Sequence, residues 1–297
     1  MPDEFNNIPP LDPEGLRQIV EKKATCPFVG SAVAMQRLPV RYRADNPLAS
    51  IEDVRALGNS GGGDLGDVLA IFASGNHNFM LGADGQLDRK APQGLFSLEF
   101  PGSQGSHPGH SGILQADPRQ LGSGRFSQAD FQRLAGRVRE GFITRSDVAK
   151  FIAENLHRDQ NSKVFGTAVL KALGHDLAHF VESLGPFLLA EVHRAGPLSD
   201  AHRSLEEKFT KLTGEDNLAG SCGEFGLLFA FLANRPGARE IDGEPVLLLE
   251  DLQLMFVEKR IPEGWESWKK TRIDWLTNST ALMISAGKAY LARGAAT

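Results

Sequence analysis

The sequence predicts a single all-α domain that spans residues 1–297. In most segments apolar residues recur at helical spacing, few segments alternate with the period of two that is typical of strands, and no series of strands and helices follows along the chain. No internal repeat indicates a solenoid or a propeller. A composition of 41% apolar and 23% charged residues is that of an ordinary globular protein.

The first third of the chain predicts short helices and one long irregular stretch. Ser50 predicts the start of a helix, because its hydroxyl can cap free N–H groups and acidic residues follow in the first turn. Residues 82–124 are rich in Gly, Pro, Ser, Gln and His, and a loop of this length is usually functional or disordered. The other expectations are a flexible arm at 1–13, helices at 13–23 and 64–79, a short apolar segment at 28–35 and a loop at 37–47.

The remainder of the chain predicts mainly helices. Thr144 and Asp147 have the spacing of a capping box, which marks the start of a helix. Residues 247–249 are the best strand candidate, although they suit a helix equally well. All three tryptophans are expected in the core, because they share one helical segment. Helices are expected at 127–138, 144–156, 162–193 with a break near 185–186, 220–233, 245–256 and 265–291.

Composition excludes several classes of protein. A formal charge of −5 gives no support to a nucleic-acid partner. The two cysteines, Cys26 and Cys222, exclude a disulfide framework. The N-terminus lacks the basic start and apolar run of a secretory signal, and no apolar stretch is long enough for a membrane span. We therefore expect a cytoplasmic protein with neither a membrane nor a nucleic-acid partner.

The first candidate for chemistry is the segment Cys26, Pro27 and Phe28. Proline is favoured at the first position of a helix, which would make Cys26 the N-cap. A thiol at that place faces unpaired N–H groups, so its thiolate is favoured, and a thiolate can bind a soft metal or a haem iron. The alternative is a buried structural cysteine that happens to precede proline.

The second candidate is Glu224, which is the last ionisable residue before the apolar run of residues 225–233. A carboxyl group at the edge of such a run should be desolvated, which raises its pKa and suits it to general acid–base chemistry. The alternative is a solvated glutamate that interacts with the helix dipole.

Histidines provide two further candidates. His107, His110 and the neighbouring Ser111 lie in the Gly-rich loop and could bind a metal or position a proton, or could simply be solvated. His175 and His179 have the i, i+4 spacing with which zinc hydrolases hold their metal, although this spacing is also common in ordinary histidine pairs. The chain has neither a phosphate loop nor a Gly-x-Ser-x-Gly elbow.

Five motifs follow one another along the chain. They are a Cys-Pro pair at 26–27, a Leu-Pro pair at 38–39, a Ser- and His-rich box at 106–111, a Gly-Glu pair at 223–224 and a Pro-Glu-Gly-Trp segment at 262–265. In this order they resemble the haem-thiolate peroxidases, the family of chloroperoxidase and the unspecific peroxygenases (peroxidase family 2). The helix that begins near residue 125 is also similar to the helix that follows the box in that family.

The resemblance implies a peroxidase or peroxygenase with about ten helices around a pocket for haem b. Cys26 would be the axial ligand of the iron, hydrogen peroxide would react on the opposite face, and a small organic substrate would be oxidised. The family's box holds Mg²⁺ or Mn²⁺ against a haem propionate, although the acidic residues of the box are absent here. The implied roles are acid–base catalysis for Glu224 with His107, cofactor binding for Cys26, Pro27, Phe28 and Ser111, and a substrate channel for Phe225, Phe229 and Phe231.

Two other functions remain open from the sequence. A haem-binding protein of the same fold without catalysis is suggested by the missing acids of the box, and by Asn217 at a position where the longer peroxygenases have arginine. A metal-dependent hydrolase built around His175 and His179 is the other alternative.

Overall fold

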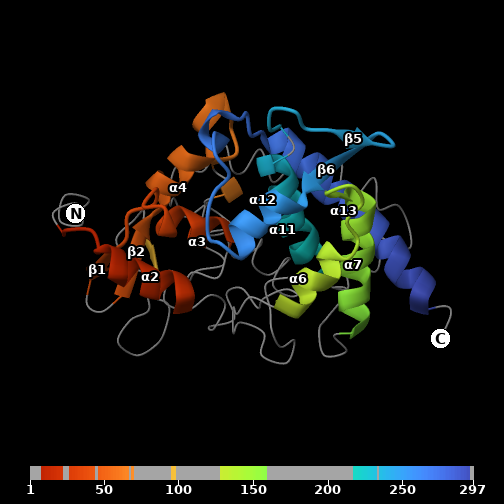
Figure 1. Ribbon diagram of the computed structural model, residues 1–297, viewed down its shortest axis with the longest axis horizontal. Helices are drawn as coiled ribbons and strands as arrows, with labels where there is room; N and C mark the ends of the chain where they lie inside the picture. The colour runs from red at the N-terminus through yellow and green to blue at the C-terminus, as the bar shows by residue number, and fades with distance from the viewer. Residues whose placement is uncertain are drawn as a thin grey trace, which may run out of the picture.

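The computed structural model describes residues 8–22, 27–43, 46–66, 68–69, 95–97, 128–158, 217–232 and 234–294. Helix accounts for 63% of the residues that can be interpreted, in eight α-helices, and two small antiparallel sheets are also present (Figure 1). The chain is therefore mostly helical, as predicted, and the described residues also form strands that the all-α prediction did not include. A total of about ten helices stays a prediction for the whole chain.

The N-terminal elements lie together at one end of the molecule (Figure 1). Strands β1, β2 and β3 form one sheet in that order, with antiparallel neighbours. Of the expected N-terminal arm, the described residues 8–12 are attached to this end, because the N–H of Leu11 donates to the carbonyl of Val40 at 2.9 Å. The elements are α2 (Pro13–Lys22), α3 (Pro27–Ala34), β1 (Arg41–Arg43), β2 (Asn46–Ser50), α4 (Ile51–Gly58), the 3₁₀ turn η1 (Ser60–Gly62) and β3 (Leu95–Ser97).

The C-terminal elements form two helix–strand–helix units followed by a long helix. In the first unit β4 connects α6 and α7, and in the second β6 connects α11 and α12. Strands β4 and β6 pair antiparallel with Ile143 opposite Leu247, which joins the two units side by side. The elements are α6 (Gln128–Ala135), β4 (Phe142–Thr144), α7 (Arg145–Arg158), α11 (Asn217–Leu232), β5 (Glu240–Ile241), β6 (Glu244–Leu248), α12 (Leu249–Phe256), the 3₁₀ turn η2 (Trp265–Ser267) and α13 (Arg272–Gly294).

Two helix starts confirm the capping predictions. The Ser50 hydroxyl accepts hydrogen bonds from the N–H groups of Glu52 and Asp53, at 3.1 and 3.4 Å. At the start of α7, the N–H of Asp147 donates to Oγ1 of Thr144 at 3.1 Å, and the Thr144 hydroxyl donates to the Asp147 carboxylate at 2.7 Å. Side-chain acceptors thus satisfy N–H groups that a helix leaves free at its first turn.

The predicted loop at residues 37–47 is wrong in its second half, because β1 and β2 form a hairpin there. The register pairs Arg41 with Leu48 and Arg43 with Asn46, so only two residues connect the strands. Two-residue connections are the commonest in β-hairpins. The pairing satisfies backbone groups of a polar segment whose side chains show no strand-like alternation.

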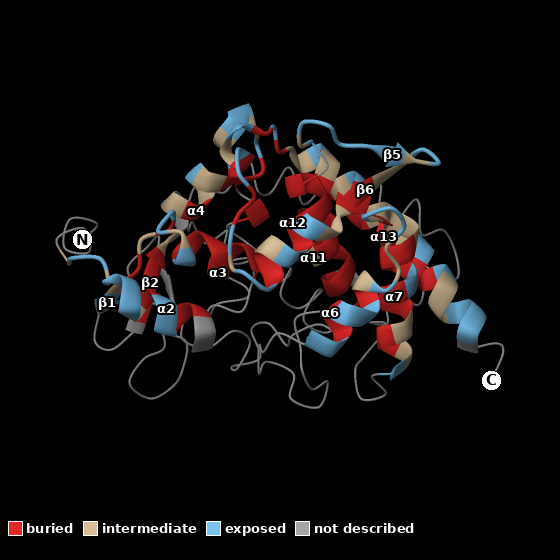
Figure 2. Cartoon of the chain, viewed as in Figure 1, coloured by how far each residue is buried: buried red, intermediate tan, exposed pale blue. Residues whose placement is uncertain are grey.

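The core lies around α11, which packs against α7 and α13 (Figures 1 and 2). The ring of Phe151 on α7 meets that of Phe225 on α11 edge to face, with centroids 6.3 Å apart. Phe131 on α6 packs against Phe256 on α12 at 6.2 Å. The expectation that the tryptophans are core residues is confirmed, because Trp265, Trp268 and Trp275 are all buried.

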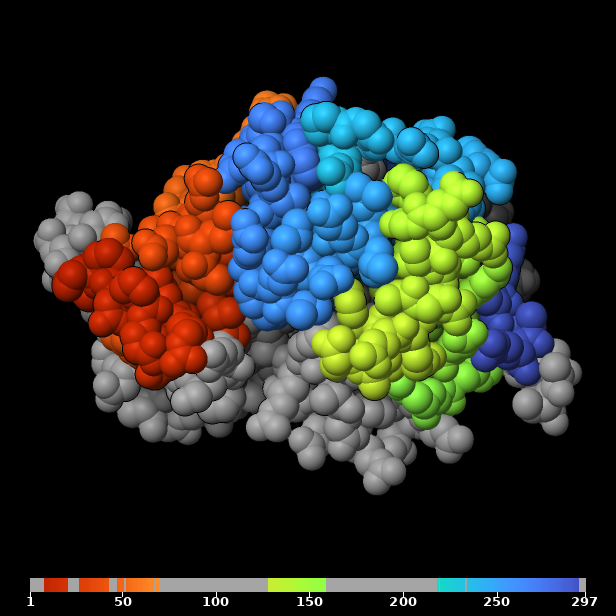
Figure 3. Space-filling model, viewed as in Figure 1, coloured from red at the N-terminus to blue at the C-terminus, as the bar shows by residue number. Residues whose placement is uncertain are grey.

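The space-filling view places α12 and its neighbours at the surface, between the N-terminal elements and the α6–α7 pair (Figure 3). Among the described residues, no helix combines the length and the apolar character that crossing a bilayer would require.

Candidate functional site

The helix that follows the Cys-Pro motif begins where the sequence predicts. Helix α3 starts at Pro27, and all its residues from Pro27 to Val33 are buried. The hydroxyl of Ser31 donates to the carbonyl of Pro27 at 2.6 Å, and the carbonyl of Met255 on α12 lies 3.2 Å from the same oxygen. The first turn of α3 is thus held inside the protein. Cys26 itself lies outside the described residues.

Glu224 lies on α11 and is the only acidic or basic residue of that helix. It is half-buried, whereas its neighbours Gly223 and Phe225 are buried. The indole N–H of Trp275 on α13 donates to the carbonyl of Gly223 at 3.2 Å, which fixes this turn of α11 against α13. The carboxyl group is thereby held at one position on a helix that has no other charged residue.

Glu224 and Phe231 lie on the same face of α11, because seven residues make almost two full turns. Phe231 in turn stacks on Phe28, with ring centroids 4.8 Å apart. Phe28 is the second residue of α3 and follows Cys26 by two positions. The helix that follows the Cys-Pro motif therefore contacts the face of α11 that carries Glu224. Glu224 lies about 10 Å along the helix axis from Phe231.

The three phenylalanines assigned to a substrate channel are all buried on α11, but they point in different directions. Phe225 packs toward Phe151 on α7, on another side of the helix from Glu224. Phe231 contacts both Phe28 and Trp265, whose centroids lie 4.8 and 5.6 Å from its own. Of the three, Phe231 lies on the face of α11 that carries Glu224. The substrate channel itself stays a prediction.

Two buried hydrogen-bond donors on this side of α11 have no partner among the residues that the structure describes. The Ser221 hydroxyl lies one turn before Glu224, and the indole nitrogen of Trp265 belongs to the ring that packs on Phe28 and Phe231. Ser31 on α3 shows the usual alternative, in which a helical serine bonds to the carbonyl four residues earlier. Because a buried donor without an acceptor is costly, both groups suit a ligand that brings acceptor oxygens.

The remaining predicted site residues lie outside the described part of the chain. They are His107 and Ser111 of the expected loop and the pair His175 and His179. Within the described ranges, no group of three or more His, Cys, Asp or Glu side chains is placed to hold a metal ion.

Lys270 is an unusual residue that the sequence analysis missed. It is fully buried, and Nζ donates to the carbonyls of Trp265 and Trp268 at 2.8 and 2.6 Å. Nζ also lies 4.0 Å from the centroid of the Trp265 ring. Burial lowers the pKa of Lys270 from its ordinary 10.5 to about 8, against the opposing attraction of Glu266. Lys270 thus fixes the turn that carries Trp265 to the aromatic contact with Phe28.

Comparisons with known proteins find no match for this chain, whether among family models, curated proteins or solved structures.

Proposed function

We propose that this chain is a haem-thiolate peroxidase or peroxygenase that uses hydrogen peroxide to oxidise a small organic substrate. The observation that carries the proposal is the contact of Phe28 with Phe231. It brings the helix that follows Cys26 to the face of α11 that also carries Glu224. The contact thus joins the helix that follows the candidate iron ligand to the helix that carries the candidate acid–base group.

Three features of the described residues support this proposal. The first turn of α3 is buried and forms the positive end of the helix dipole, an environment in which a thiolate is favoured. Phe28, Phe231 and Trp265 form an apolar cluster where α3 meets α11, which would provide one wall of a haem pocket. The unpartnered donors of Ser221 and Trp265 could bond to the propionates of the group.

In this proposal Cys26 would hold the haem iron through its thiolate, and Pro27 and Phe28 would support that position. When bound, the haem supplies the oxidation chemistry, and the thiolate donates electron density that favours cleavage of the O–O bond. Glu224 would serve as the group that accepts a proton from one oxygen of hydrogen peroxide and delivers it to the other. His107 orients the Glu224 carboxylate, and Ser111 belongs to the cofactor site. A cytoplasmic location suits this scheme, because a reducing compartment keeps a free thiol available.

Peroxide-dependent turnover of an organic substrate by the haem-loaded protein tests the proposal. Glu224→Gln keeps the shape of the side chain but cannot accept the proton, so turnover should fall by about 100-fold or more, the lower end of what general acid–base groups contribute. Glu250→Gln is a matched control, since Glu250 lies on α12 outside this face. Haem uptake without peroxide-dependent turnover, unchanged in Glu224→Gln, would support the alternative of a haem-binding protein without catalysis. Full turnover in Glu224→Gln would contradict the role proposed for Glu224.

A further inference from the structure

The end of α3 is joined to residues 257–264, the segment that leads from α12 to η2. In this segment the backbone N–H of Ile261 donates to Sδ of Met35 at 3.0 Å. Two residues after Met35, the guanidinium group of Arg37 forms an ion pair with the carboxylate of Glu266 at 3.1 Å. A polar contact at this junction thus depends on a methionine sulfur, alongside an ion pair at the surface.

The backbone at Met35 is fixed by the way in which α3 ends. Gln36 has a φ of 57°, in the left-handed region. The N–H groups of Gln36 and Arg37 donate to the carbonyls of Val33 and Ala32, at 3.0 and 2.8 Å. This is the hydrogen-bond pattern of a Schellman motif. Met35 is half-buried and packs against the core, whereas its neighbour Gln36 is exposed, so Met35 lies at the edge of the core.

The sulfur of Met35 is a weak acceptor for a strong donor. A backbone N–H needs a partner when it is buried, and Ile261 is only 4% exposed. A thioether accepts hydrogen bonds weakly, whereas an oxygen atom accepts them well. Sδ of Met35 is the acceptor that the described residues provide for this N–H. An oxygen bound to that sulfur would therefore be a better partner for Ile261 than the sulfur itself.

We propose that Met35 is an oxidation site, at which hydrogen peroxide forms a methionine sulfoxide that the N–H of Ile261 retains. A lone pair of Sδ attacks one oxygen of the peroxide, an S–O bond forms and the O–O bond breaks. The other oxygen leaves as water with both protons, so the sulfur is oxidised by two electrons and the peroxide is reduced. The methionine side chain has three rotatable bonds, which allow the new oxygen to turn toward the N–H.

The other described methionines lack such a donor. Met255 is fully buried, which keeps peroxide away from its sulfur. Met283 on α13 is half-buried like Met35 and packs against the core, and none of the described residues donates a hydrogen bond to its sulfur. A sulfoxide at Met283 would place a polar group without a partner against apolar side chains, which is costly. Oxidation should therefore be tolerated at Met35 and should destabilise the fold at Met283.

The biological role of the Met35 site rests on the proposed function, because that function supplies the hydrogen peroxide. Met35 would consume peroxide that is not used in turnover, at little cost to the fold. The oxidation itself needs neither haem nor Cys26. It can therefore be tested on the full chain with no haem added, so that failure of the proposed function and failure of this site give different results.

Peroxide treatment of the folded Met283→Leu and Met35→Leu variants, followed by peptide mass spectrometry and thermal unfolding, tests the site. Leucine replaces methionine at little cost in either place. Met1 and Met80 are present in both variants, so the difference between the variants isolates Met35 and Met283. Once Met35 is oxidised in Met283→Leu, we expect the unfolding midpoint to move by less than about 1 °C, whereas oxidation of Met283 in Met35→Leu should lower it by about 2 °C or more.

A second readout is the backbone amide resonance of Ile261 in the ¹⁵N-labelled chain. It should move downfield on oxidation of Met283→Leu, because the N–H gains a stronger acceptor, and it should stay in place in Met35→Leu. A folded protein in which peroxide leaves Met35 unmodified would overturn the proposal. An Ile261 resonance that moves equally in both variants, or an equal loss of thermal stability in both, would overturn it as well.

Discussion

The rings of Phe28 and Phe231 stack with their centroids 4.8 Å apart and their planes 29° from parallel. This contact joins α3, which begins directly after Cys26, to the face of α11 that carries Glu224. Trp265 packs against both rings, at 5.1 and 5.6 Å, so three segments of the chain meet here. The contact is the structural basis of the proposed function and can be tested directly.

The Phe28–Phe231 pair should show a favourable coupling energy in a double-mutant cycle. We expect Phe28→Leu and Phe231→Leu together to lower the free energy of unfolding by about 1 kcal/mol less than the sum of the single changes, because the ring contact is lost only once. Urea unfolding of the four proteins measures this coupling. Phe225 is the control, since its ring packs on Phe151. Phe28→Leu and Phe225→Leu should therefore add, and coupling of equal size there would argue against a specific contact.

The capping box of α7 should contribute measurably to stability. Thr144→Ala should lower the free energy of unfolding by about 1 kcal/mol, because the N–H of Asp147 loses its acceptor. Thr144→Ser keeps the hydroxyl and should stay close to the unchanged protein. Thermal or urea unfolding checks the difference, and equal losses in both variants would show that the methyl group matters rather than the cap.

Close packing of α11 on α13 should make Gly226 intolerant of a side chain. A Cβ atom at this position would lie 1.9 Å from Oγ of Ser279 and 3.0 Å from its Cα, so the helices would have to shift. We expect Gly226→Ala to lower the free energy of unfolding by about 2 kcal/mol. Adding Ser279→Ala should recover part of that loss, since the nearest clashing atom is removed. No recovery in the double variant would place the strain elsewhere.

Lys270 should make stability depend on pH in the alkaline range. Its pKa is about 8 in the folded protein and 10.5 ordinarily, so between these values the unfolded chain binds a proton that the folded chain does not. Stability contributed by this group therefore rises as the pH increases from about 8 to 10.5 and is constant below that range. Lys270→Met should lack this rise. Denaturant unfolding of both proteins from pH 7 to 10 measures it, and parallel curves would contradict the assignment.

Local features of the fold could be predicted because they depend on neighbouring residues. Ser50 and the Thr144–Asp147 pair cap helices through atoms two or three positions away, so the sequence pattern contains the whole interaction. The burial of α11 followed from an apolar run that only a core can accommodate. The place of Glu224 on that helix could be predicted in the same way.

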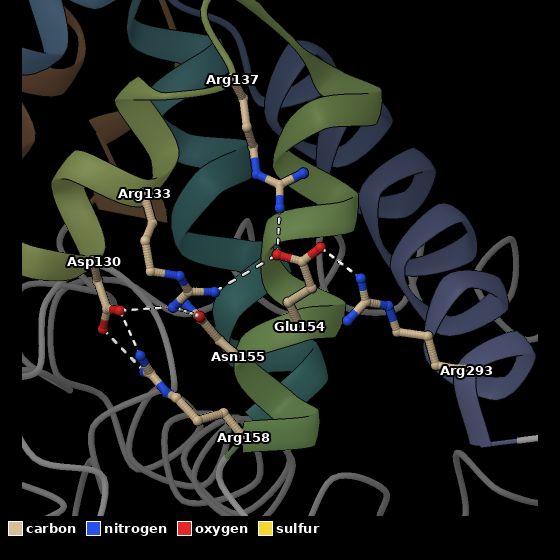
Figure 4. A network of polar contacts seen from close by, with 7 residues as sticks. All are labelled: Asp130, Arg133, Arg137, Glu154, Asn155, Arg158 and Arg293. Carbon is tan, nitrogen blue, oxygen red and sulfur yellow. Dashed lines mark hydrogen bonds and ion pairs between the residues drawn. The ribbon is translucent and has the colours of Figure 1, made fainter. Parts of the chain in front are cut away.

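Features that depend on distant partners could not be predicted. Residues 244–248 form a strand because β4 supplies hydrogen bonds to them, although their apolar run suits a helix equally well. In the sequence, Lys270 belongs to a polar segment and gives no sign of burial. It is buried because the carbonyl groups of Trp265 and Trp268 and the Trp265 ring surround its ammonium group. The ion pairs of Glu154 with Arg133 and Arg293 likewise form only when α6, α7 and α13 come together (Figure 4).

The absorption spectrum of the reduced, carbon monoxide-treated protein tests the central claim most directly, with Cys26→Ala and Cys222→Ala compared with the unchanged chain. Cys222 is the chain's other cysteine and is buried on α11, which makes it the matched control. We predict the red-shifted band of a thiolate-bound haem in the unchanged protein and in Cys222→Ala, and its loss in Cys26→Ala. A protein that takes up no haem, or a thiolate band that persists in Cys26→Ala, would contradict the account.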